Sequence, residues 1–294
     1  MRPPERDRTE AVAAPCTELG FGGTVLLDTS LLIELQKRDK YALPVRKAVS
    51  HFRFKGASSY SKLEFKRAWI REIAYIHTLC RDAGVRSIAD VIDRINRRLA
   101  SPHQRRRVQT CMEAFTAFFE FGKYALSDRA QLARLRSLCK TRVLEGAIAL
   151  REAITSEFRG TECVRAEEPP TEHSDGSLNV TIRRCSPDRI QCRVHTFFSE
   201  NEDHFAQLAN EIDSNPGASQ ELKTMRDHIR LAQQEAIHLC DDKHCSKLAD
   251  SIIAVDGKNM DVFAANNDKE WITIAKTMAK PLVNPVSGLC HRPD

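Results

Sequence analysis

Short apolar runs alternate along the chain with longer segments whose apolar residues recur at helical spacing. The first half predicts strands over 25–27 and 54–59, and helices from 31, over 44–52, and from 61 to a stop at Gly84. Asp28 stands where the first strand ends. This order of elements is typical of the start of an α/β fold.

A mostly helical region follows. Helices are expected over 87–99, from 102 to about 121, and from 127 to about 158. Gly160 opens a polar loop, and two β-like runs, 178–185 and 189–198, joined by Ser-Pro-Asp, predict a β-hairpin.

Predicted helices and strands alternate again in the last third of the chain. Helices are expected over 202–213, 219–239, 246–257 and 268–280, with strands over 260–266 and 281–285. The two ends of the chain thus predict one α/β unit, made of residues 22–65 and 240–294. Residues 66–239 form a helical insertion with a hairpin near 178–198, and 1–21 a flexible N-terminal lead.

Composition is typical of a globular protein with a substantial core: 41% of the 294 residues are hydrophobic and 29% are charged. No apolar run approaches the length of a membrane span, and the N-terminus lacks the apolar region of a secretory signal. The ten cysteines are scattered rather than framed as a disulfide scaffold. We therefore expect a cytoplasmic protein with no membrane contact and mostly free, buried thiols.

The net charge of +5 is unevenly distributed. Residues 65–150 hold 17 Lys and Arg against 8 Asp and Glu. Arginines cluster at Arg94, Arg97, Arg98, Arg105, Arg106 and Arg107, and again at Arg134, Arg136 and Arg142. These side chains either contact the phosphates of a nucleic acid or form solvated helix faces.

Acidic residues stand beside predicted strand ends or helix starts at four places: Asp28, Glu64, Asp250 and Asp268, with Glu270 two residues on. Strands of a parallel sheet deliver such side chains to one edge, where ligands bind in open α/β folds. Clustered carboxylates repel one another, and divalent cations such as Mg²⁺ or Mn²⁺ relieve that cost.

Each acid also has a structural explanation. Asp28 can cap the following helix, Glu64 can complete a capping box that starts at Ser61, and Asp250 can be the polar edge of an amphipathic helix. Asp268 can be the N-cap of the last helix, and Glu270 can pair with that helix's dipole.

Together the segments VLLDTSLLIEL, SSYSKLEF, KLADSIIA and FAANNDKEW resemble the PIN-domain nucleases, including the ribonucleases of bacterial toxin–antitoxin pairs. The resemblance implies a three-layer α/β/α sandwich with a central parallel sheet. It also implies an acidic quartet of Asp28, Glu64, Asp250 and either Asp268 or Glu270. Thr29 or Ser30 and Asn267 would be supporting residues. It covers residues 22–65 and 240–288, whereas family members have only a short helical stretch between the second and third acids.

The activity implied is hydrolysis of RNA by a Mg²⁺- or Mn²⁺-dependent endoribonuclease, with the basic insertion holding the RNA or a partner over the acidic cleft. An inhibitory protein or a second copy of the chain is a further expected partner. The alternatives are a PIN-like RNA- or protein-binding scaffold that does not cut, and a DNA nuclease of similar chemistry. A phosphatase with two aspartates at the strand end is disfavoured, because Ser30 occupies the second position.

Two groups of Cys and His residues are weaker metal candidates. Cys163, Cys185, Cys192 and His195 contain the residue types of a structural zinc site but lack its tight C-x₂-C pairs, so free or oxidisable thiols are the alternative. For Cys240, His244 and Cys245 we favour packing over metal binding.

Overall fold

The computed structural model describes residues 14–15, 23–37, 42–98, 101, 104–105, 108–109, 111–112, 115, 127–185, 193–235, 239, 241–266 and 268–292. The side chains at 14, 15, 98, 164, 242 and 268 are also outside the description. Of the predicted features, Asn267, Arg106, Arg107, Cys192, Cys240, most of the helix over 102–121 and most of the N-terminal lead lie outside it.

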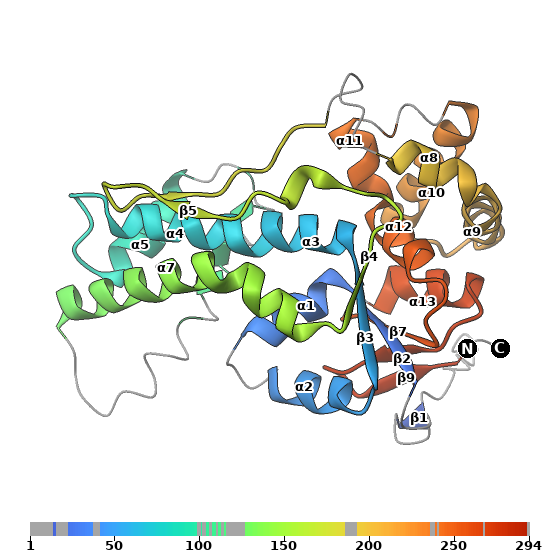
Figure 1. The fold of residues 1–294 in the computed structure, drawn as a ribbon, viewed down its shortest axis with the longest axis horizontal. Coiled ribbons are helices and arrows are strands. Elements are labelled where there is room, and N and C mark those ends of the chain that lie inside the picture. Colours follow the sequence, from blue (N-terminus) through green and yellow to red (C-terminus); the bar gives the residue numbers. More distant parts are fainter. Residues whose placement is uncertain are drawn as a thin grey trace, which may run out of the picture.

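A mostly parallel β-sheet forms the centre of the molecule (Figure 1). Its strand order is β1-β9-β8-β7-β2-β3-β4. The five strands from β8 to β4 run parallel, whereas β9 and β1 are antiparallel additions at one edge. The strands are β1 (Ala14–Pro15), β2 (Thr24–Leu27), β3 (Phe54–Ser58), β4 (Ser156–Phe158), β7 (Val262–Ala264), β8 (Leu282–Asn284) and β9 (Leu289–His291).

Helices cover both faces of this sheet. The first half contributes α1 (Thr29–Gln36), α2 (Ala42–Ser50), α3 (Ser59–Phe65), the π-helical turn η2 (Lys66–Ile70), α4 (Arg71–Cys80), α5 (Ile88–Arg98) and α7 (Asp128–Ala153). The second half contributes α8 (Val194–Glu200), α9 (Glu202–Ser214), α10 (Gln220–Gln234), α11 (Asp242–Cys245), α12 (Ala249–Asp256) and α13 (Asp268–Thr277). Short 3₁₀ turns lie at Val164–Ala166 and Ser246–Leu248.

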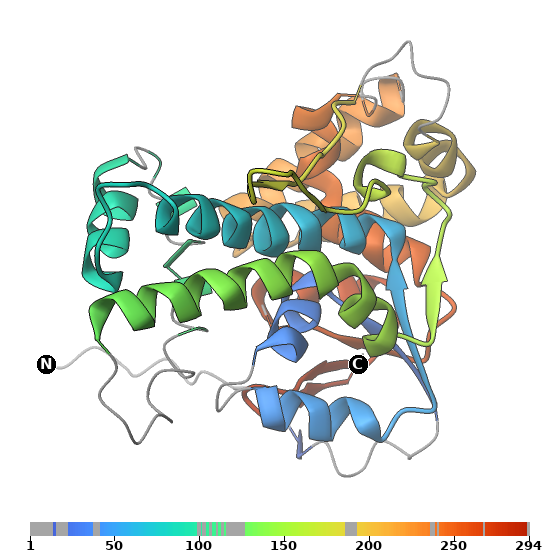
Figure 2. The same ribbon diagram turned by 60° about the vertical axis from the view of Figure 1, so that its left-hand side comes forward.

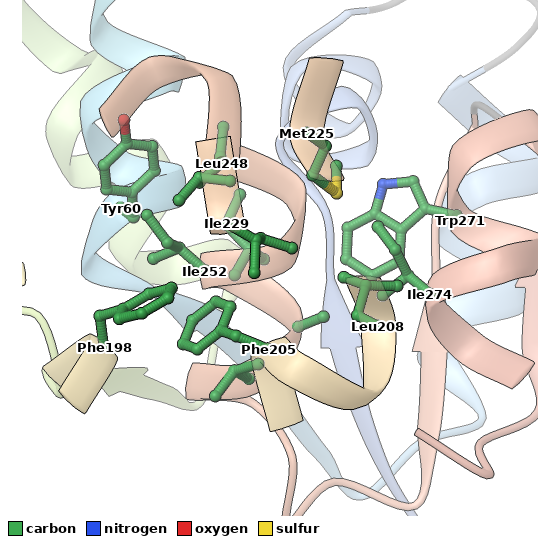
Figure 3. Close-up of a cluster of buried hydrophobic side chains, with 14 of the residues drawn as sticks. Tyr60, Phe198, Phe205, Leu208, Met225, Ile229, Leu248, Ile252, Trp271 and Ile274 are labelled. Atoms are coloured by element: carbon green, nitrogen blue, oxygen red, sulfur yellow. The ribbon is translucent and has the colours of Figure 1, made fainter. Parts of the chain in front are cut away.

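Side chains of β2 alternate between two hydrophobic cores. Val25 and Leu27 belong to the core shared with α1, α2, α4 and α7, while Leu26 points into the core formed with α9, α10, α12 and α13. The second core holds Phe198 stacked on Phe205 at a centroid distance of 4.4 Å (Figure 3). This alternation makes the fold compatible with three α/β/α layers.

Helices α4 and α7 lie side by side and extend beyond the sheet (Figures 1 and 2). A two-stranded hairpin, β5 (Thr171–Glu172) and β6 (Leu178–Asn179), lies along α4. None of the described helices is both apolar enough and long enough to pass through a bilayer.

Several predictions of local structure are corrected. The helix predicted from 127 to about 158 ends at Ala153, and 156–158 form β4, because these residues pair with β3. The hairpin predicted from 178 to 198 is replaced by one between 171 and 179, and 194–200 are helical. Phe197 and Phe198 are buried by helical packing in the second core, which overrides the β-like composition of that run.

The N-terminal lead and the cysteines also differ in part from expectation. Residues 14–15 of the lead form β1, paired with β9, where Ala14 is opposite Cys290. Six described cysteines are reduced thiols, as expected, but Cys290 is disulfide-bonded. The sequence prediction missed β1 and β9, whose two and three residues are too few for a periodic pattern of their own.

Candidate active site

The acidic site lies where the sheet changes its direction of winding. After β2 the chain enters α1 on one face of the sheet, whereas after the neighbouring β7 it enters α13 on the other. The carboxyl ends of two such strands border a crevice that binds ligands in open α/β sheets. Asp28 directly follows β2, and α13 begins four residues after β7.

Asp28 is both the residue at the strand end and the N-cap of α1. Its carboxylate accepts hydrogen bonds from the backbone N–H of Ser30 at 3.1 Å and from the Ser30 hydroxyl at 2.6 Å. The same hydroxyl accepts from the backbone N–H of Asn266 beyond β7, at 3.1 Å. The two sequence interpretations of Asp28 therefore coexist, and Ser30 fixes the carboxylate across the junction of the two strands.

Glu64 lies on α3, opposite the first turn of α1. Its Oε2 accepts a hydrogen bond from the Thr29 hydroxyl at 2.8 Å. The predicted capping box is wrong: α3 begins at Ser59, and Ser58 is its N-cap, accepting from the backbone N–H of Tyr60. Ser61 lies inside the helix with a buried hydroxyl that has no hydrogen-bond partner among the described residues. Helix initiation therefore does not explain Glu64, and the π-helical turn η2 begins two residues later, a feature frequent at functional sites.

Asp250 and Glu270 complete the acidic group. Asp250 is in the first turn of α12, and Glu270 is buried near the start of α13, where it accepts a hydrogen bond from Ser219 at 3.1 Å. Both line a pocket of about 390 Å³, together with Met225 and Lys247. Asp268 is the first residue of α13 rather than its cap. Of the two candidates for the fourth acid, Glu270 is the one whose described side chain reaches the group.

The carboxylates interact electrostatically. Burial raises the pKa of Asp28, against the hydrogen bonds from Ser30 that lower it. Burial, followed by the charge of Asp28, raises the pKa of Glu64 to about 7. For Asp250, burial comes first and the charges of Asp28, Glu64 and Glu270 follow, and its pKa lies well above the usual range. Three elements distant in sequence thus bring their acids into one partly desolvated group.

The other predicted site residues are arranged differently. Arg94 and Arg97 form ion pairs with Asp82 and Asp93 within the protein. Cys245 packs in the second core and donates a hydrogen bond to the Tyr60 hydroxyl at 3.2 Å, as the packing interpretation predicted. Within the described part of the chain, no three His, Cys, Asp or Glu residues form a group that could hold a metal ion, and the zinc set with Cys192 extends beyond that part.

The pocket beside Asp250 was missed by sequence reasoning. One wall comes from α10, where two pairs of residues four positions apart line the pocket: Gln220 with Thr224, and Glu221 with Met225. The helical spacing of 219–239 was visible in the sequence, but not the neighbour that this face contacts. Comparison with protein-family models, curated proteins and solved structures finds no match.

The raised pKa of Glu64 predicts a specific pH dependence of stability. With a pKa of about 7 in the folded state and 4.5 in the unfolded state, the folded protein holds an extra proton between these values. The contribution of Glu64 to the free energy of unfolding is therefore complete below pH 4.5 and is lost as the pH rises through 7. Between pH 5 and pH 7 in chelator, the free energy of unfolding should fall by about 2 kcal/mol more in wild type than in Glu64→Gln. Urea unfolding measures this difference.

The comparison with Glu64→Gln is essential, because the titration of His77 changes the stability with pH in the opposite direction. Burial lowers the pKa of His77 from 6.5 to about 4, so its contribution to stability grows as the pH rises through that range. This background is the same in both proteins and cancels in the difference. Parallel stability profiles for the two proteins would show that the pKa of Glu64 is not raised in the folded state.

Proposed function

We propose that the protein is a metal-dependent endoribonuclease with a PIN-like α/β/α fold. The observation that carries the proposal is the coupling of three buried or partly buried carboxylates, Asp28, Glu64 and Asp250, at the crevice between β2 and β7. Gathering like charges in a desolvated site is unfavourable unless the site serves cation binding or acid–base chemistry.

The donor set fits a hard divalent cation. Carboxylate and hydroxyl oxygens are the ligands that Mg²⁺ and Mn²⁺ prefer. Mg²⁺ commonly binds through one or two carboxylates, several waters and the phosphates of a substrate, so it does not require three protein ligands. Asp28, Glu64 and Asp250 would hold the ion, with Glu270 or Asp268 as the fourth acid.

Three of the acids have a hydrogen-bond partner that restricts their orientation. Ser30 holds Asp28, Thr29 holds Glu64, and Ser219 holds Glu270. A bound Mg²⁺ or Mn²⁺ would supply Lewis-acid stabilisation of the phosphodiester and lower the pKa of a water. Lys247, on the wall shared with Asp250, offers a positive charge to a substrate phosphate. We place the protein in the cytoplasm with RNA as its substrate, and with an inhibitory protein or a second copy of the chain as a further partner.

The second candidate is a PIN-like scaffold that binds RNA or a protein without cutting. It is favoured by the absence of a preformed three-ligand group among the described residues. Metal binding separates the two candidates, because a ligand that binds only the folded state raises its stability.

Two aspartates on α12 provide a matched test. Asp250 repels its neighbours, whereas the carboxylate of Asp256 accepts hydrogen bonds from Ser58 at 2.6 Å and from the backbone N–H of Gly160 at 3.0 Å. We expect Asp250→Asn to be about 1 kcal/mol more stable than wild type in chelator and to lose the stabilisation by Mn²⁺. Asp256→Asn should be about 1–2 kcal/mol less stable than wild type and should retain the stabilisation by Mn²⁺. The measurement is thermal unfolding with Mn²⁺ and with chelator; a wild type that Mn²⁺ does not stabilise favours the scaffold.

A further inference from the structure

A second pocket lies away from the acidic site, on the extension formed by α4 and α7. It has a volume of about 370 Å³ and is bounded by the two helices and the β5–β6 hairpin, which lies along α4 in Figures 1 and 2. Its ionisable lining consists of His77, Arg81, Arg136, Lys140, Glu172 and Asp175. Three of these side chains are cationic and two are anionic.

His77 is buried at the pocket wall, with 2% of its surface exposed. Its Nδ1 has no hydrogen-bond partner among the described residues, which is unusual for a buried polar atom. Burial, followed by the charges of Arg81 and Arg136, lowers the pKa of His77 to about 4. At neutral pH the ring is therefore uncharged, and it can present an N–H to the pocket.

The cations are only partly neutralised by the hairpin. Lys140 forms an ion pair with Glu172 at 2.7 Å, and Arg81 donates to the backbone carbonyl of Asp175 at 2.5 Å. The Asp175 carboxylate lies farther from Arg81, at 3.8 Å. Arg136 is exposed and has no hydrogen bond or ion pair with any other described residue. The pocket thus has one uncompensated guanidinium beside one unsatisfied imidazole.

We propose that this pocket binds a phosphoryl anion, with Arg136 and Arg81 as its charged ligands and His77 as an uncharged donor. Guanidinium groups match the geometry of phosphate oxygens, and hydrogen bonds between ionised groups are the stronger class. The hairpin acids Glu172 and Asp175 occupy the same cavity as built-in counter-ions, so they compete with an incoming anion. The phosphoryl group comes either from a small phosphorylated molecule or from a nucleic-acid backbone.

The test is calorimetric titration of the full-length protein with inorganic phosphate at low ionic strength. Arg136→Gln should weaken binding about fivefold or more, whereas Arg134→Gln, an exposed arginine on the same helix outside the pocket, should leave it unchanged. Glu172→Gln should tighten binding, because it removes a competing carboxylate. Absence of saturable binding to wild type, or equal losses in both arginine variants, would overturn the proposal.

A second titration separates the two sources. Oligodeoxythymidylate presents the same phosphates on a backbone. If Arg136→Gln also weakens its binding and inorganic phosphate competes with it, the site holds a nucleic-acid strand. If the oligonucleotide binds equally to both proteins while phosphate binding falls, the ligand is a small phosphorylated molecule. Neither titration depends on cleavage, so the result is independent of the proposed nuclease activity.

Discussion

Asp28→Asn is expected to lower the rate of RNA cleavage at least about a hundredfold, the usual cost of removing one group that stabilises charge in a transition state. Asp28 is central to the acidic group: its charge raises the pKa of both Glu64 and Asp250. The amide keeps the size of the side chain and one acceptor for Ser30, so the fold should persist. The measurement is cleavage of labelled single-stranded RNA with Mg²⁺ or Mn²⁺, with and without chelator.

Asp261→Asn is the matched control. Asp261 stands at the opposite end of the same strand pair, where its carboxylate accepts hydrogen bonds from the backbone N–H and hydroxyl of Thr24 at 2.8 and 2.9 Å. The Asp261→Asn variant should retain the full rate of RNA cleavage. Cleavage that survives both Asp28→Asn and chelator would exclude a metal-dependent mechanism at this site, and wild type that binds RNA but never cleaves it would favour the scaffold.

Trp271→Ala is expected to cost about 3–5 kcal/mol of folding free energy, the range for removing a fully buried aromatic side chain. Trp271 is 1% exposed and packs edge-on against Phe263 of β7, with ring centroids 5.8 Å apart. Figure 3 shows it among Leu208, Met225 and Ile274, which come from α9, α10 and α13. The indole therefore joins the helices of the second core to the sheet. Urea unfolding measures the loss.

The adjacent residue supplies the control. Ile272 is 37% exposed on the same helix, and Ile272→Ala should cost no more than about 0.5 kcal/mol. Because Trp271 directly follows Glu270, its loss should also weaken stabilisation by Mn²⁺, whereas the control should not. Equal destabilisation by the two variants would show that the indole does not anchor α13.

Local sequence pattern was sufficient to predict most of the α/β unit formed by the two ends of the chain. The strand predicted over 25–27, the strand predicted over 54–59 and the helix predicted from 268 correspond to β2, β3 and α13, because apolar spacing and turn residues indicate each of them locally. Strand β4 and the hairpin were mispredicted. Residues 156–158 are a strand only because Gly56, Ala57 and Ser58 lie beside them, 100 positions earlier in the chain.

The candidate acids were identified from their positions after strands and at helix starts. The sequence did not show which residues each of them contacts. From the sequence, Glu64 could complete a capping box that starts at Ser61. In the structure α3 begins at Ser59, so Glu64 does not have this role. The sequence also left Asp268 and Glu270 equivalent; the structure shows Glu270 buried with a hydrogen bond from Ser219 of the insertion, and the side chain of Asp268 is outside the description. The insertion was unexplained by sequence, and the structure shows that α10 forms one wall of the pocket beside Asp250.

The sequence by itself determined which residues are apolar, where most helices and strands form, and that acids stand at their ends, because these depend on neighbours a few positions apart. Only the tertiary structure decided that Asp28, Glu64 and Asp250 share one desolvated site, that Arg94 is paired while Arg136 is not, and that His77 is buried beside cations. Burial and electrostatic coupling depend on distances between segments far apart in the chain, and those distances are set by the packing of the two cores against the sheet.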